Sequence, residues 1–68
     1  MDNFFVIEIS DGDERIAGKA IYGYQTEREA VATFHQRMAT AMKSDLYDSE
    51  LVLVIDKYGV ILWQDRFL

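Results

Sequence analysis

Two segments of this chain are apolar without interruption, and they constrain its fold more than any other feature of the sequence. Residues 4–7 read Phe-Phe-Val-Ile, and residues 51–55 read Leu-Val-Leu-Val-Ile. Because side chains alternate between the two faces of a strand, such runs predict strands that are buried on both faces. The sequence offers one long helix, which can cover only one face of a small sheet. We therefore expect the other face to be covered by another molecule, most simply a second copy of the chain.

Length and composition limit how such a core can be stabilised. The 68 residues form a single domain, 1–68, and a chain of this size buries only about 60% of its unfolded surface. The absence of cysteine excludes disulfides and thiolate metal sites, and a single histidine argues against zinc. We expect no metal and no cofactor, so association is the remaining source of stability.

The net charge is −5, from 12 acidic and 7 basic residues. Binding to nucleic acid needs clustered lysine and arginine, so we predict no direct nucleic-acid partner. An acidic chain could instead bind a basic host protein surface or imitate a nucleic acid, although modest negative charge also keeps a small domain soluble. No segment has the ~18 apolar residues of a membrane span, and no signal peptide is visible. We therefore predict a cytoplasmic protein with no membrane partner.

The order of elements is predicted as two strands, a helix and two strands. We expect the strands at about residues 3–9, 15–24, 50–56 and 60–66. Thr26 and Glu29 form a capping box that starts a helix running to about Lys43. A tight turn at 56–59, with Gly59 in the left-handed region, joins the last two strands. With the two most apolar strands central and the thinly covered second strand at an edge, the fold is α+β, ββαββ. Its four-stranded antiparallel sheet has the order 2-1-3-4, with one helix packed on one face.

The period of two along each strand divides the residues between two faces. We assign to the helix the bulkier, uncharged set, which comprises Phe5, Ile7, Ile9, Leu51, Leu53 and Ile55. The free face would then form the interface, which comprises Phe4, Val6, Val52, Val54, Tyr22 and Trp63. Glu8 would also lie on the free face and would need either a partner such as Lys19 or Arg66 or a place at the rim of the interface. The alternative is a half-apolar, solvated face.

On the helix, one apolar stripe at spacings of three and four comprises Val31, Phe34, Met38, Ala41 and Met42. Arg37 falls on another face. His35 is the only imidazole, and no Ser or Thr with a carboxylate is spaced to form a relay with it. We interpret it as a surface or boundary histidine and predict that the protein has no catalytic residue and is not an enzyme.

Two other patterns of the sequence resemble binding motifs. Residues 11–14 resemble the start of a calcium loop, but Tyr22 occupies the place of the closing Glu. The tyrosines and Trp63 could serve as stacking platforms for bases, yet few basic residues accompany them. We interpret them as residues of the core or of a dimer interface.

The predicted topology brings the first turn and the end of the helix to the same end of the domain. Six acids would gather there beside the negative pole of the helix. This predicted acidic patch comprises Asp11, Asp13, Glu14, Asp45, Asp48 and Glu50. It could attract a divalent cation or a basic protein surface, or its acids could be separately solvated and screened.

The stretch from Lys19 to Gly59 resembles small uncharacterised ββαββ proteins of Firmicute genomes, phages or mobile elements. The residues that carry the resemblance are Tyr24, 29–35, Met38, 41–43 and 49–51. Such proteins have no established activity, so the resemblance implies a context and no site residues. The sequence thus predicts an acidic, non-catalytic protein-interaction module, homodimeric through the free sheet face. The alternatives are a phage or mobile-element inhibitor that mimics nucleic acid, and acidic loops that bind a divalent cation.

Overall fold

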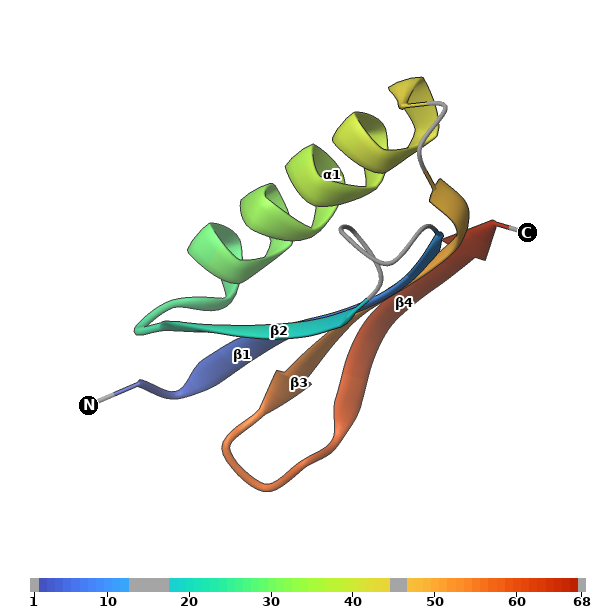
Figure 1. Ribbon diagram of the computed structural model, residues 1–68. Coiled ribbons are helices and arrows are strands. Elements are labelled where there is room, and N and C mark those ends of the chain that lie inside the picture. The colour runs from blue at the N-terminus through green and yellow to red at the C-terminus, as the bar shows by residue number, and fades with distance from the viewer. Residues whose placement is uncertain (1, 13–17, 45–46, 68) are drawn as a thin grey trace.

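The computed structural model describes residues 2–12, 18–44 and 47–67 and shows a four-stranded sheet with one helix across it (Figure 1). The elements are β1 (Phe4–Gly12), β2 (Gly18–Tyr24), α1 (Glu27–Lys43), β3 (Tyr47–Asp56) and β4 (Ile61–Phe67). The strand order is β2-β1-β3-β4, and each neighbouring pair is antiparallel. The predicted α+β fold, with β2 at an edge, is confirmed.

Local signals set the start of the helix and the turn of the last hairpin. Thr26 is the N-cap of α1, and its hydroxyl accepts the Glu29 backbone N–H at 3.2 Å. The Glu29 carboxylate accepts a hydrogen bond from the same hydroxyl at 2.9 Å, where the capping box predicts a bond to the Thr26 N–H. Gly59 has a φ of 85°, in the left-handed region as predicted, and the Asp56 carboxylate accepts two backbone N–H groups of the turn.

The helix covers the sheet face that the sequence pattern left free. Its core comprises Ala30, Phe34 and Met38 of the helix above Val6, Val52 and Val54 of the sheet, with Phe4, Tyr22 and Tyr24 packed against them. The three valines are fully buried. Trp63 also lies on this side, with its ring centroid 6.4 Å from that of Phe34. The predicted interface of Phe4, Val6, Val52, Val54, Tyr22 and Trp63 is therefore wrong.

Two physical reasons explain the exchange of faces. Valine side chains are short and stiff, so they allow a helix to approach the sheet closely. The sequence pattern placed the helix on the other face because Glu8 is charged, but Arg37 of the helix pairs with Glu8. The bulkier isoleucine and leucine set lies on the opposite face.

The buried stripe of α1 is also shifted from the prediction. Ala30, Phe34, Met38 and Ala41 are the buried helix residues, at spacings of four, four and three. Met42, in the last turn, is 65% exposed and does not belong to the stripe. Within the described part of the chain, no helix is both long enough and apolar enough to cross a membrane.

Candidate functional site

The sheet face that α1 leaves bare is a nearly continuous apolar surface, which we call the uncovered face. The strand register arranges its residues in three rows running from β2 through β1 and β3 to β4. The first row comprises Gly23, Phe5, Ile55 and Ile61; the second, Ile21, Ile7, Leu53 and Gln64; the third, Lys19, Ile9, Leu51 and Arg66. Eight of these twelve residues have apolar side chains and none has a carboxylate, so the surface differs sharply from the acidic chain as a whole.

Exposure is greatest at the margins of the uncovered face. Ile21 is 68% exposed, Ile61 is 52% and Ile9 is 37%. The inner apolar residues are half-buried by their neighbours in the sheet. Four strands at ~4.8 Å spacing and three rows at ~6.6 Å spacing give a face of roughly 19 by 20 Å, or about 380 Å² in projection. Monomers rarely expose apolar patches beyond a few hundred Å².

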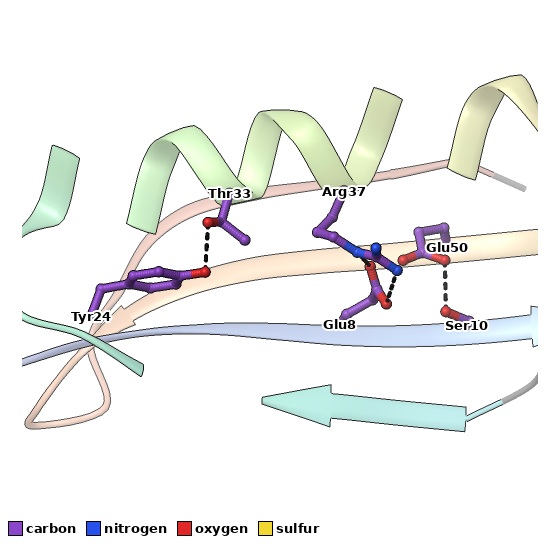
Figure 2. Close-up of polar contacts among 6 residues, drawn as sticks. All are labelled: Glu8, Ser10, Tyr24, Thr33, Arg37 and Glu50. Carbon is purple, nitrogen blue, oxygen red and sulfur yellow. Dashed lines mark hydrogen bonds and ion pairs between the residues drawn. The ribbon is translucent and has the colours of Figure 1, made fainter. Parts of the chain in front are cut away.

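Beneath the helix, an ion pair joins α1 to the centre of the sheet (Figure 2). Glu8 on β1 is only 5% exposed, and Arg37 of α1 contacts both of its carboxylate oxygens. The Nε–Oε2 distance is 2.7 Å and the Nη2–Oε1 distance is 3.0 Å. A two-pronged, charge-assisted contact of this kind compensates a buried carboxylate. Arg37 thus takes the place that the sequence pattern gave to Lys19 or Arg66, both of which lie on the uncovered face.

A second carboxyl group lies in the same layer. Glu50 of β3 is 2% exposed, and its Oε2 accepts a hydrogen bond from the Ser10 hydroxyl at 2.8 Å. Its Oε1 has no hydrogen-bond partner among the described residues. Burial raises the pKa of Glu50 to about 7, and the neighbouring Glu8 acts in the same direction, whereas Ser10 and Arg37 act against it. The Arg37 guanidinium therefore acts on two carboxyl groups, those of Glu8 and Glu50. The Glu50 carboxyl group keeps its proton up to about neutral pH.

A smaller polar contact joins the N-terminal half of α1 to β2. The Thr33 hydroxyl of α1 donates to the Tyr24 hydroxyl of β2 at 2.7 Å (Figure 2). His35 is exposed, as predicted, and its ring packs edge-on against Phe34 at 5.1 Å and Trp63 at 6.2 Å. These contacts give Tyr24, Phe34 and Trp63 a structural role.

Only some residues of the predicted acidic patch are among those that the structure describes. Asp13, Glu14 and Asp45 lie outside the described residues, and Asp48 is placed only as part of β3. Asp11 is exposed and pairs with Ser49, one step beyond the third row of the uncovered face. Glu50 is buried, so its assignment to a solvated patch is wrong. Among the residues described, no group of three or more His, Cys, Asp or Glu side chains could hold a metal ion.

The fold and these two features define the class of the molecule as a small ββαββ protein with one uncovered apolar sheet face. We found no family model that matches the chain, and no curated protein or solved structure that matches it. The resemblance to small Firmicute, phage or mobile-element proteins stays a prediction. The acidic mimic of nucleic acid stays a prediction as well.

Proposed function

We propose that this chain is a non-catalytic protein-interaction module that forms a homodimer through the uncovered face. The observation that carries the proposal is the row pattern of that face, with eight apolar side chains and no carboxylate. The carboxyl groups of Glu8 and Glu50, which are of the kind that acid–base chemistry uses, lie beneath the helix, where a substrate has no access.

Burial of the uncovered face supplies the driving force for association. Apolar surface removed from water contributes ~25 cal/mol per Å² before the cost of association is subtracted. Two projected faces of about 380 Å² sum to roughly 760 Å², and a surface textured by side chains has more accessible area than its projection. The sum approaches the ~1,000 Å² expected of a specific interface.

A second copy fits this face better than an acidic or basic partner does. Each copy carries a net charge of −5, so association would be opposed if the acids lay between the copies. The twelve positions of the uncovered face hold only two charges, on Lys19 and Arg66 at its third row. Among the described residues, the Asp2 carboxylate lies over Gly23 at one edge of the face and Asp11 lies one step beyond its third row, so negative charge borders the twelve positions without occupying them.

Sedimentation equilibrium of matched variants tests the proposal. Ile21 on the uncovered face is 68% exposed and Met42 on the helix is 65% exposed, so replacing either one by lysine should leave the fold intact. The wild type is expected to sediment at tens of micromolar with twice its 7.9 kDa mass. Ile21→Lys should weaken the dimer roughly 100-fold, because burial of two isoleucines, one from each copy, is lost.

Met42→Lys makes the same change of charge and should leave the dimer unchanged. A wild-type protein of 7.9 kDa at every concentration would overturn the proposal. Equal effects of the two lysine variants would also overturn it. Far-ultraviolet circular dichroism of each variant shows that the fold is retained.

A further inference from the structure

Two opposite charges on the uncovered face, those of Lys19 and Asp2, lie at opposite ends of β2. Lys19 pairs with Ile9 in the third row. Gly23 pairs with Phe5 in the first row and has no side chain. The Asp2 carboxylate lies over Gly23, since a Cβ built on this glycine would lie 2.7 Å from Cγ of Asp2. One end of β2 therefore presents a carboxylate and the other an ammonium, four residues or roughly 13 Å apart.

Resting on the proposed dimer, we propose that the two copies pack face to face with antiparallel strands, so that Asp2 of each copy meets Lys19 of the other. The two-fold axis then lies between the sheets and runs across the strands. In the aligned class of face-to-face packing, the strands of the two sheets stay within about 30° of each other, so β2 lies over β2 of the second copy. The second row meets its own image, and the first row meets the third.

The second aligned arrangement of two sheets face to face has its two-fold axis along the strands. It places β2 over β4 of the second copy and each row over its own image. Lys19 of one copy would then face Arg66 of the other, and Asp2 would face an apolar residue, Ile61. Like charges brought together at an interface oppose binding, whereas the antiparallel arrangement brings the opposite charges of Asp2 and Lys19 together.

The shape of the face agrees with the antiparallel arrangement. A shallow open hollow is lined by Leu51, Gln64 and Arg66 of the uncovered face, together with Asp65. When β4 lies over β4 and the first row over the third, Ile61 of the second copy comes over this hollow. Ile61 is 52% exposed in one chain, so its side chain is available to fill it.

Charge reversal tests this arrangement through the dimer dissociation constant, measured by sedimentation velocity at ~0.1 M salt. Asp2→Lys and Lys19→Asp should each weaken the dimer roughly tenfold, because two attractions per dimer become repulsions. The double variant, Asp2→Lys with Lys19→Asp, should restore the wild-type constant. Within one chain these two positions are more than a Debye length apart, so restoration reports a contact between copies.

Lys57→Asp is the matched control for Lys19→Asp. Lys57 is exposed in the β3–β4 turn, so this variant changes net charge equally without touching the uncovered face. It should leave the dissociation constant within about twofold of the wild type. Lys19→Asp would instead tighten a dimer with the axis along the strands, because the introduced carboxylate would face Arg66.

The outcomes separate this inference from the proposed function. Tightening by Lys19→Asp, or a double variant weaker than either single one, would overturn the antiparallel arrangement. If Ile21→Lys still dissociated the dimer, the proposed function would stand. A monomeric wild type would overturn both.

Discussion

Glu50→Gln is expected to stabilise this protein above neutral pH. Glu50 is 2% exposed, accepts one hydrogen bond from Ser10, and has a pKa raised to about 7 mainly by burial. Above that pH the folded chain must hold an ionised carboxylate beside the Glu8–Arg37 pair. Glutamine has nearly the shape of the protonated carboxyl group and carries no charge, so it removes this cost.

The magnitude follows from proton linkage. A pKa of 4.5 in the unfolded chain and about 7 in the folded chain means that the folded state binds more protons between these values. The free energy of unfolding therefore falls as pH rises from 4.5 to 7, and the stabilisation is lost above 7. At about 1.4 kcal/mol per pKa unit, the loss is at most about 3 kcal/mol, a large share of the roughly 5–15 kcal/mol typical of domains.

The assay is urea denaturation from pH 4.5 to 8.5, with wild type and variant at one fixed protein concentration because a dimer unfolds with concentration dependence. We expect Glu50→Gln to match the wild type near pH 4.5 and to exceed it by about 2–3 kcal/mol at pH 8. The control is Glu27→Gln, which removes an exposed carboxylate from the first turn of α1. It should lower the free energy of unfolding by less than about 1 kcal/mol, because a negative charge there interacts favourably with the helix dipole. A Glu50→Gln variant less stable than wild type at pH 8 would refute the reasoning.

Two further substitutions test the packing beneath the helix by the same denaturation assay. Arg37→Met leaves Glu8 buried without its cation and should lower the free energy of unfolding by about 2 kcal/mol. This cost is smaller than that of breaking a fully buried ion pair, because Arg37 is partly exposed. The double variant, Arg37→Met with Glu8→Met, should recover much of the loss. If the double variant were no more stable than Arg37→Met, the ion pair would not be what links α1 to β1. Val52→Ala opens a cavity in the core and should cost about 2 kcal/mol, whereas Val60→Ala, at a 55% exposed site, should cost less than about 0.5 kcal/mol. Equal losses at the two valines would contradict the burial of Val52 beneath the helix.

The sequence predicted the strand order because apolar content separates central from edge strands. The continuous runs at 4–7 and 51–55 became the central strands β1 and β3, and the glycine-rich segment became the edge strand β2. The capping residue Thr26 and the turn residue Gly59 act through their own backbone, so their roles could be inferred locally.

The sequence did not predict which face the helix covers, because both faces of β1 and β3 are apolar. Bulk and absence of charge favoured the isoleucine and leucine set, but the helix brings Arg37 to Glu8 and so tolerates charge in its interface. A signal was present: Glu8 and Glu50 share a face with the valines, and Arg37 lies three residues after Phe34, beside the buried stripe. The raised pKa of Glu50 follows from burial, which depends on the packed structure.

Isotope-filtered nuclear Overhauser spectra of a mixture of labelled and unlabelled protein test the central claim most directly. The account predicts contacts between copies from the methyl groups of Ile7, Ile21 and Leu53, and none from those of Val6 or Val52 beneath the helix. Absence of any contact between copies on the uncovered face, at a protein concentration of hundreds of micromolar, would contradict it.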